Sequence, residues 1–573
     1  MEVIITFLAI FAVFLYVMIR NSIEEKNRYK VYRNDMQKLY GSFMDKEYSE
    51  ENMEKISRYY MHLKCDNESL SNEIDDITWN DLSMDDIYAK MNYCQSSSGE
   101  EYLYAMLRRP LLGDEQKFHE SLDRHINYMD KRENEKLDTI MALYRLGKSG
   151  RFSIFDYLDY IDELGSRKNT KHYVAIVLLI AAIVMIFVNV SIGVGALILV
   201  VCFNIVVYFK EKGVAQPYVT SFSYIIRMIK TAENIIKCNT QSDNEDISGY
   251  ISDLKIKRNN LKDLEKNSAI VLKMNSSVGS FEEILFDYIK MVTHLDLIQF
   301  NKMLNIVQKN RREIEDLVVS IGYIDAVISI AYFRKALPHY CVPTLIKKQD
   351  DKSIILNIVD GYHPLIKSPV TNSFNQKKGM LITGSNASGK STFLKMTAIN
   401  ALLAQTIYTC AAKEYQGNYF KIYSSMSLRD NLAGGESYYI VEIKALKRIA
   451  DIADEASENP LLCFVDEVLR GTNTVERIAA STQILDRLSQ KNILCFAATH
   501  DIELTHLLEN KYDNYHFEEE VKDGDMLFSY HLLNGRAHTR NAIRLLEIMG
   551  YSEEIIKKAD LMAQNFLKNG EWK

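Results

Sequence analysis

The stretch LITGSNASGKSTFLK, residues 381–395, fits the phosphate-binding pattern G-x-x-x-x-G-K-[ST] from Gly384 to Ser391. Glycine is needed in such a loop because backbone N–H groups must approach phosphate oxygens closely at the positive end of the following helix. An apolar strand precedes the loop and a helical segment follows it. The pattern predicts that Lys390 reaches the β and γ phosphates of a nucleotide and that Ser391 ligates Mg²⁺. The candidate nucleotide ligands are Gly384, Asn386, Gly389, Lys390, Ser391 and Thr392.

Two further polar signals follow predicted buried strands. LLCFVDE, residues 461–467, ends in Asp466 and Glu467, and NILCFAATH, residues 492–500, ends in His500. We expect Asp466 to hold Mg²⁺ and Glu467 to act as general base toward the attacking water. His500 is placed to hydrogen-bond the γ-phosphate or that water. Each residue alone also fits a solvated strand end or a structural histidine, but their order after the phosphate loop favours the catalytic interpretation.

Length, net charge and cysteine content limit the number of domains and the kinds of partner and metal to expect. A chain of 573 residues is too long for one ordinary core, so several domains are expected. The net charge of −7 neither indicates a nucleic-acid partner nor excludes a local basic groove. The 8 cysteines form no C-x-x-C pair, so reduced thiols in a cytosolic setting are expected and zinc is not.

Two uncharged runs indicate membrane segments. Val3–Ile19 is at the short end of what spans a bilayer, and it lacks the positive start and the small-residue cleavage site of a signal peptide, which favours an uncleaved anchor. The run 173–209 would form a helix of about 55 Å, far longer than the ~30 Å hydrocarbon layer. We therefore expect two spanning helices, 173–188 and 192–209, joined at NVSIG; a single buried soluble helix is the alternative.

Basic residues indicate the orientation of these three spans. Lysine and arginine follow the first span and flank both ends of the hairpin, and such residues favour the cytoplasmic side. We expect the N-terminus outside, the protein in the cell membrane as a multi-pass chain, and everything after residue 210 in the cytoplasm.

The pattern of apolar residues along the chain changes near residue 352. Before it, outside the apolar runs, the sequence reads as long helices. After it, short apolar runs alternate with helical stretches, which predicts an α/β nucleotide-binding domain.

Several stretches together resemble a known family. LITGSNASGKSTFLKM, LLCFVDEVLRGTNTVERIAAS and FAATHDIELTHL resemble, in order and spacing, the ATPase domain of the MutS family of DNA mismatch-repair proteins. LRDNLAGGESYYIVEI resembles that family's signature loop, with Ser437 in the serine position and Glu442 in the following "VE". IVDGYHPLI and RNAIRLLEIMGYSEEIIKKA resemble the entry and the helical close of that domain. SSSGEEYLYAMLRRPLL and ALPHYCVPTL resemble the family's helical core.

The resemblance implies a helical core and lever region and a C-terminal α/β P-loop ATPase domain of the ABC/MutS type. The two uncharged runs add transmembrane helices, so the expected fold is multidomain, and the hairpin interrupts the helical core. The resemblance also implies Mg²⁺ and ATP as ligands, and a homodimer in which Ser437 of one subunit completes the γ-phosphate site of the other. The expected divisions are 1–20 anchor, 21–77 helical linker, 78–170 first part of the core, 173–209 membrane hairpin, 210–350 levers and end of the core, and 352–573 ATPase domain.

The chain also departs from the family pattern. The mismatch-reading domain of the family carries a Phe-x-Glu motif near the N-terminus, whereas the matches here begin at Phe281 and Phe517. The region before residue 78 is too short for that domain and for the connector after it. A basic cluster, Lys255, Lys257, Arg258 and Lys262, is a candidate for contacting DNA phosphates, with a solvated helix face as the alternative.

Two functions stay open at this point. The first is a membrane-anchored ATPase coupled to DNA binding. The second is an ATP-driven membrane scaffold or conformational switch that acts on a protein partner without DNA.

Overall fold

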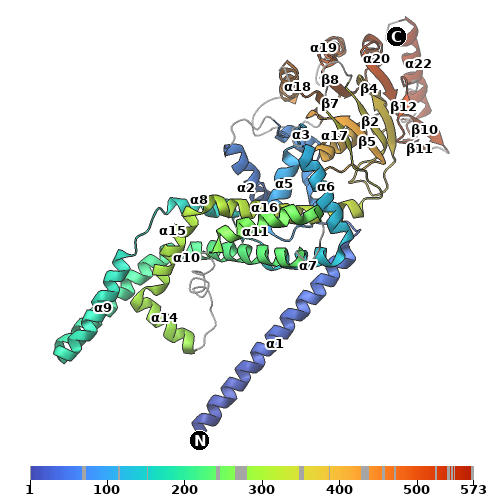
Figure 1. Ribbon diagram of the computed structural model, residues 1–573. Helices are drawn as coiled ribbons and strands as arrows, with labels where there is room; N and C mark the ends of the chain where they lie inside the picture. Colours follow the sequence, from blue (N-terminus) through green and yellow to red (C-terminus); the bar gives the residue numbers. More distant parts are fainter. Residues whose placement is uncertain are drawn as a thin grey trace. The chain divides into compact units, whose positions relative to one another are not determined.

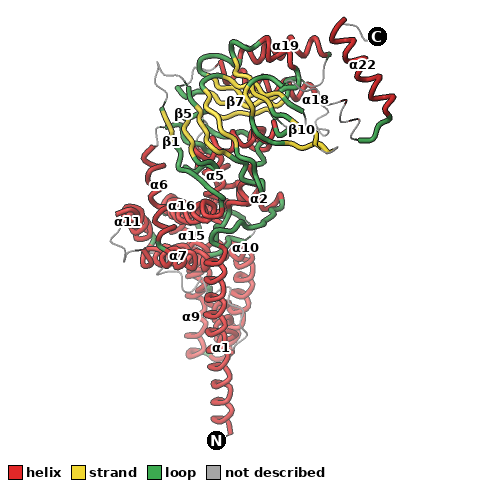
Figure 2. The backbone as a smooth tube through the Cα atoms, turned by 90° about the vertical axis from the view of Figure 1, so that its right-hand side faces the viewer, coloured by secondary structure: helices red, strands yellow, loops and turns green. Residues whose placement is uncertain are grey.

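The structure is a computed structural model, and its chain divides into two compact units that are treated separately below. The helical unit comprises Met1–Ser69, Met91–Ala105 and Ser121–Ala336, and the sheet unit comprises Leu70–Lys90, Met106–Glu120 and Leu337–Lys573. Figures 1 and 2 show the elements of both units. The described residues are 2–66, 72–113, 116–150, 152–239, 245–262, 264, 281–347, 354–385, 388–426, 438–454, 458–469, 473–522, 525–537, 543, 546 and 549–569.

The helical unit is built from long helices. Its elements are α1 (Glu2–Leu39), α2 (Glu50–Asp66), α7 (Glu133–Leu146), α8 (Ile154–Glu163), α9 (Thr170–Val188), α10 (Val190–Asn239), α11 (Glu245–Asn260), α14 (Phe281–Thr293), α15 (Leu295–Lys309) and α16 (Arg311–Ala336), with most of α5 (Ser97–Arg108) and α6 (Gln116–Lys131).

Helix α16 forms the centre of this unit, and nearly all of its residues after the first turn are buried. Its Asp325 accepts hydrogen bonds from the backbone N–H of Ser96 (2.8 Å) and from the Ser96 hydroxyl (2.6 Å), at the positive N-terminal end of α5. Helices α16 and α5 also approach each other closely at Gly322. Only glycine fits there, because a Cβ on Gly322 would lie 2.5 Å from the carbonyl oxygen of Ser98.

Helices α9 and α10 form the hairpin expected from the second apolar run, and they lie side by side in Figure 1. The turn falls at Asn189, where the helices are so close that a Cβ on Gly193 would lie 2.4 Å from the backbone N of Ile186. Three helices of the described part are long and apolar enough to cross a membrane: α9, Val190–Gln216 of α10, and α16.

These three candidates differ in burial. The most apolar stretches of α9 and α10 have mean hydropathies of 2.5 and 2.7, and only 17% and 11% of their residues are buried. The stretch in α16 has a mean hydropathy of 1.6 and is 83% buried, so α16 is a core helix of the unit. The predicted first span, Val3–Ile19, lies within α1.

The second helix of the hairpin is much longer than predicted. The sequence predicted an end at residue 209, but α10 continues to Asn239. Its C-terminal half carries buried apolar side chains, among them Phe222, Ile225 and Ile229, and packs on α7, α11 and α16. This packing supplies most of the stability of such a helix, which is why the end of the apolar run did not mark the end of the element.

The sheet unit contains a six-stranded sheet in the order β12-β9-β4-β8-β7-β6, in which all strands except β12 are parallel. A four-stranded sheet has the order β1-β5-β2-β3, and β10 and β11 form a hairpin. The strands are β1 (Thr344–Ile346), β2 (Leu356–Gly361), β3 (Asn372–Gln376), β4 (Gly379–Thr383), β5 (Glu414–Asn418), β6 (Lys421–Ser425), β7 (Leu461–Asp466), β8 (Ile493–Ala498), β9 (Tyr512–His516), β10 (Glu519–Lys522), β11 (Asp525–Phe528) and β12 (Leu533–Asn534).

Helices cover the six-stranded sheet, so its central strands are apolar throughout. The helices of this unit include α3 (Asp76–Asp81), α4 (Met84–Met91), α17 (Lys390–Thr406), α18 (Tyr438–Asp454), α19 (Thr474–Arg487), α20 (Ile502–Leu507) and α22 (Glu553–Asn569). Leu461, Cys463 and Val465 of β7 pack with residues of α18, α19 and α20. The alternate residue Phe464 contacts Phe496 of β8, as expected for side chains that alternate between the two faces of a strand.

The structure divides the predicted 78–170 segment between the two units. Residues 70–90 and 106–120 belong to the sheet unit, because α3 packs on β6: the Ser424 hydroxyl donates to Asp81 (2.7 Å), and the Ser424 N–H donates to the Thr78 hydroxyl (3.1 Å). The sheet unit also begins before the predicted residue 352, since β1 pairs with β5.

Candidate functional site

The phosphate-loop pattern lies between β4 and α17. Gly384 has φ +144°, and a Cβ there would lie 2.8 Å from the Ser388 hydroxyl and 3.0 Å from the carbonyl oxygen of Phe517. Gly389, the residue before α17, has φ +102°, in the left-handed region that other residues rarely adopt. Both positions therefore require glycine. The described part of the loop also contains a buried hydroxyl oxygen without a hydrogen-bond partner, Oγ of Ser385, which suits a loop that binds an anion.

Lys390 is the first residue of α17 and is 3% exposed. Its Nζ donates to the carbonyl oxygens of Gly384 (2.8 Å) and Ser385 (2.6 Å) and lies 3.4 Å from Nε2 of His500. The loop carbonyls thus hold the positive charge of Lys390 next to the loop, at the N-terminus of α17. This charge and the helix dipole both favour anions there.

Ser391 and Asp466 meet although they are 75 residues apart in the sequence. The Ser391 hydroxyl, in the first turn of α17, donates to Oδ2 of Asp466 at the end of β7. A hydroxyl and a carboxylate are two oxygen ligands that Mg²⁺ accepts in a nucleotide site, where phosphate oxygens and water complete its shell. The described residues contain no cluster of three or more His, Cys, Asp or Glu side chains suited to a metal, and a site of this kind needs no such cluster.

Glu467 and His500 face each other across the ends of adjacent strands. Nε2 of His500 lies 2.7 Å from Oε1 of Glu467, and their side chains are 38% and 22% exposed, respectively. Beside them lies a cavity of about 200 Å³, lined in addition by Val468, Thr499 and an ion pair in which Nε and Nη2 of Arg477 donate to the carboxylate of Asp501 (2.9 and 2.6 Å). A polar space of this size beside a carboxylate can hold water.

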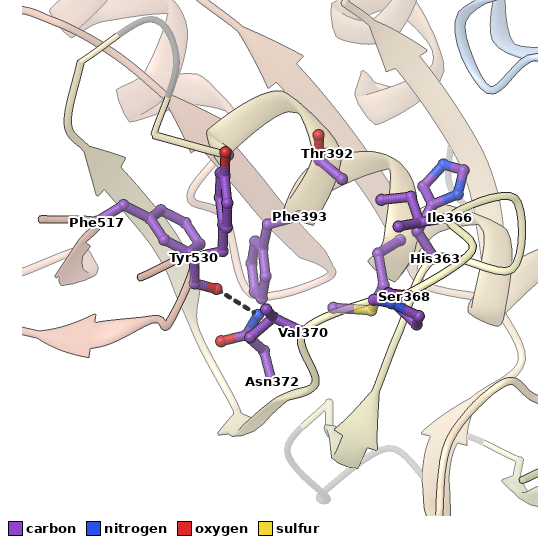
Figure 3. A pocket seen from close by; sticks show the side chains of 12 residues that line it. His363, Ile366, Ser368, Val370, Asn372, Thr392, Phe393, Phe517 and Tyr530 are labelled. Carbon is purple, nitrogen blue, oxygen red and sulfur yellow. Dashed lines mark hydrogen bonds between the residues drawn. The ribbon is translucent and has the colours of Figure 1, made fainter. Parts of the chain in front are cut away.

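A larger pocket, of about 350 Å³, lies beside the end of the loop and the first turn of α17 (Figure 3). Its walls are mostly apolar or aromatic and include Val370, Phe393, Met396, Phe517 and Tyr530, and Gly389 and Thr392 also line it. Such a pocket, with aromatic walls and few polar groups next to a phosphate loop, fits a flat nucleobase.

His363 supplies one of the polar groups in this pocket. Burial lowers its pKa to about 4, and the nearby charge of Lys395 adds to this effect, so the ring is neutral at pH 7. The Leu365 N–H donates to Nδ1 of His363 (3.3 Å), which leaves the proton of the neutral ring on Nε2. Asn372 is fixed in the same wall, because its side-chain nitrogen donates to the Tyr530 carbonyl (3.1 Å) and its oxygen accepts from the Leu532 N–H (2.8 Å).

The structure thus brings together five sequence-predicted residues, namely Lys390, Ser391, Asp466, Glu467 and His500. Gly384 and Gly389 shape the loop, and Thr392 lines the larger pocket. Asn386 and Ser437 lie outside the described residues, so their predicted roles stay predictions.

Sequence reasoning missed the larger pocket. His363 and Tyr530 are 167 positions apart, and no spacing rule joins them. His363 does lie in IVDGYHPLI, which suggested only the entry to the domain. Phe517, one of the two misplaced Phe-x-Glu matches, lines this pocket instead of contacting a base pair.

A glycine loop between a parallel strand and a helix, with a carboxylate pair and a histidine at the neighbouring strand ends, defines a P-loop nucleotide site of the ATPase type. Residues 380–567 match the MutS domain V family. This part of the chain is therefore a MutS-type domain V, the domain that the mismatch-repair relatives below share with it.

Curated relatives agree with this assignment. A DNA mismatch repair protein MutS of Thermus thermophilus is 33% identical over 209 residues, which are 36% of this chain and 25% of that protein. MutS of Thermotoga maritima is 28% identical over 304 residues, 50% of this chain and 36% of that protein. The DNA mismatch repair protein MSH3 of Phaeosphaeria nodorum is 26% identical over 278 residues, 46% of this chain and 24% of that protein. The chain therefore spans only about a quarter to a third of the length of these relatives.

Proposed function

We propose that this chain is a membrane-anchored ATPase that binds and hydrolyses ATP as a homodimer and couples this cycle to DNA binding. The observation that carries the proposal is the convergence of Lys390, Ser391, Asp466, Glu467 and His500 at the carboxyl ends of three neighbouring parallel strands. Ligands bind at this edge in open α/β sheets, because the strand ends and helix N-termini meet there.

Each residue has a role in this proposal. Lys390 and the loop amides bind the phosphates. Ser391 and Asp466 hold Mg²⁺, which neutralises phosphate charge when bound. Glu467 accepts a proton from the water whose oxygen attacks the γ-phosphorus, and the bond to the bridging oxygen of ADP breaks. His500 orients Glu467 and the water, and the pocket around His363 and Tyr530 holds the nucleobase.

The homodimer rests on the family resemblance. Ser437 of one subunit is proposed to complete the γ-phosphate site of the other, so that the interface closes on ATP and loosens after hydrolysis.

The membrane anchor is supported by the surface of the hairpin. Large apolar side chains of α9 and α10 are exposed, for instance Phe187 (86%), Val188 (80%) and Leu199 (73%). Apolar surface on this scale is unfavourable in water and is covered by lipid in a bilayer. Arg167 and Lys171 pair with Glu211 (3.3 and 2.5 Å), which holds both ends of the hairpin together on the side proposed to be cytoplasmic. We place the protein in the cell membrane, with its ATPase domain in the cytoplasm.

DNA coupling is supported by the relatives, which are named as DNA mismatch repair proteins. The basic cluster gives it less support than the sequence suggested. Lys257 pairs with Asp253 (2.8 Å) and Arg258 with Glu233 (3.0 Å), so two of the four charges are compensated within the helical unit. The alternative function, an ATP-driven membrane scaffold or switch for a protein partner, is favoured by the long α10, which continues from the hairpin into the part of the helical unit that packs on α7, α11 and α16.

The test uses the full chain in detergent and in lipid nanodiscs. ATP hydrolysis is measured with no DNA and with duplex, mismatched and branched DNA, at two salt concentrations. We expect stimulation by DNA that decreases with salt, because phosphate contacts release counterions. Hydrolysis that is unaffected by every DNA would contradict DNA coupling and favour the alternative function.

A further inference from the structure

Glu442 of α18 is a buried acidic residue, and the hydrolysis mechanism proposed above assigns it no role. It is 2% exposed, and its Oε1 accepts a hydrogen bond of 2.6 Å from the backbone N–H of Leu469. Leu469 lies two residues after Glu467, the proposed general base. Charge-assisted hydrogen bonds of this length are among the stronger ones in proteins.

The turn that Glu442 contacts has an unusual backbone. Glu467 has φ +57° and Leu469 has φ +61°, values that non-glycine residues rarely adopt and that persist only where the surroundings hold them. Such residues cluster at functional sites, where they aim a side chain that ordinary backbone would not aim.

In the described part of the chain, residues of β8, α19 and α18 form hydrogen bonds with the backbone of this turn. The Glu467 N–H donates to the carbonyl oxygen of Ala498 in β8 (2.9 Å), and the Val468 carbonyl accepts from the Ser481 hydroxyl of α19 (3.2 Å). Glu442 of α18 supplies the third contact, to Leu469, and it is the only one of the three that brings a carboxylate. Without it, a buried N–H would lose its acceptor and the left-handed conformation at Leu469 would lose a restraint.

We propose that Glu442 is a positioning residue, which fixes the turn 467–469 so that the Glu467 carboxylate faces His500 and the attacking water. The inference rests on the proposed ATPase function and deepens it. Glu442 lies in the second turn of α18, so this helix is joined to the turn that carries the proposed general base.

The test compares variants of the full chain in detergent by kcat, KM for ATP, binding of a fluorescent ATP analogue and thermal midpoint. Glu442→Ala removes the acceptor, and we expect kcat to fall about 10- to 100-fold, the scale of a misplaced catalytic group. KM and analogue binding stay unchanged, since the phosphate loop is not touched.

Glu442→Gln keeps a carbonyl acceptor, and we expect it to restore kcat to within about threefold of the wild type. Asp451→Ala, an exposed carboxylate on the same helix that pairs with Lys447, is the matched control and leaves kcat unchanged.

A second comparison separates positioning from general stability. In a Glu467→Gln background, adding Glu442→Ala should lower the residual rate by less than about twofold, because residues that act as one unit are not additive. If Glu442→Ala does not fold, Glu442→Asp serves, because it keeps the charge and shortens the reach; its kcat is then expected to fall while analogue binding persists.

The outcomes are distinct. A wild-type chain without Mg²⁺-dependent hydrolysis would contradict the proposed function. A wild-type chain that hydrolyses ATP, with Glu442→Ala and Glu442→Asp at the same rate, would overturn only the positioning role. Equal losses of analogue binding, thermal midpoint and kcat in the Ala and Gln variants would overturn it in favour of a purely structural role.

Discussion

Nε2 of His500 lies 2.7 Å from Oε1 of Glu467 and 3.4 Å from Nζ of Lys390. One ring nitrogen therefore lies near both the proposed general base and the lysine proposed to bind phosphate. The relationship follows from the sheet: β7 and β8 are parallel neighbours in which Asp466 pairs with Ala498, so the residues after each strand meet at the same edge.

The first prediction concerns the general base. In Glu467→Gln, the side chain keeps its shape but can no longer accept the proton of the attacking water. We expect phosphate release by the full chain to fall about 10²- to 10⁴-fold, the usual contribution of general base catalysis, while ATP binding is retained. The measurement is steady-state phosphate release beside light scattering, which should show an ATP-dependent dimer that persists in this variant. Wild-type turnover in Glu467→Gln would show that the base has been misassigned.

The second prediction concerns the ion pair beside the catalytic residues. Arg477 and Asp501 join α19 to the residue that follows His500, and they line the 200 Å³ cavity. Arg477→Ala leaves the Asp501 carboxylate, only 14% exposed, without this partner. We expect kcat to fall roughly tenfold through a displaced His500, with little change in KM.

Lys511→Ala is the control for this variant, because it removes a more exposed cation, which pairs with Asp486 of α19. It should leave the rate of hydrolysis unchanged. A loss of the same size in both variants would show that α19, rather than the position of His500, accounts for the effect.

The third prediction concerns acid stability of the sheet unit. Burial lowers the pKa of both His119 and His363 from about 6.5 to about 4. Between pH 4 and pH 6.5 the unfolded chain binds more protons than the folded one. The contribution of the two neutral histidines to the free energy of unfolding is therefore fully present above pH 6.5 and is lost as the pH falls toward 4. At pH 5 the loss should be on the order of 2 kcal/mol for each histidine.

The check is the denaturant midpoint of the full chain between pH 7 and pH 5. His119→Phe keeps the stacking on Tyr408, whose ring centre lies 4.7 Å away, and removes one titrating group. Its free energy of unfolding should depend less on pH than that of the wild type. An identical pH dependence would mean that His119 is not buried in its neutral form.

The fourth prediction concerns the core of the helical unit. A Cβ on Gly99 would lie 2.2 Å from the carboxylate of Asp325, which its hydrogen bonds hold in place. We expect Gly99→Ala to lower the free energy of unfolding by about 1–3 kcal/mol, the cost of overpacking a core. Gly249→Ala is the matched control, because no atom lies within 4 Å of its added Cβ, and it should raise stability by about 0.5–1 kcal/mol. Thermal unfolding measures both; an unaffected Gly99→Ala would mean that α5 and α16 are less closely packed.

The sequence was sufficient to predict which residues lie close together wherever each of them lies at the end of one element. The phosphate loop, the Asp466–Glu467 pair and His500 each follow a short apolar strand, and the parallel topology alone then brings them together. Likewise, a polar break at Asn189 inside an apolar run was enough to locate the hairpin.

Features that depend on contacts between distant segments could not be predicted in this way. The pocket proposed for the nucleobase joins His363 to Tyr530, and Glu442 reaches Leu469 through packing of α18 on the sheet. The length of α10 is set by its burial against α7, α11 and α16 rather than by the apolar run that defines its first half. Tertiary packing decided each of these features, and no local pattern encodes it.

The central claim is that this chain hydrolyses ATP with the residues at the strand ends. The most direct measurement is Mg²⁺-dependent phosphate release by the full chain in detergent, beside Lys390→Ala, which removes the cation that the loop holds. The account predicts release by the wild type that requires Mg²⁺ and is abolished in Lys390→Ala. Equal release by both proteins, or release that does not depend on Mg²⁺, would contradict it.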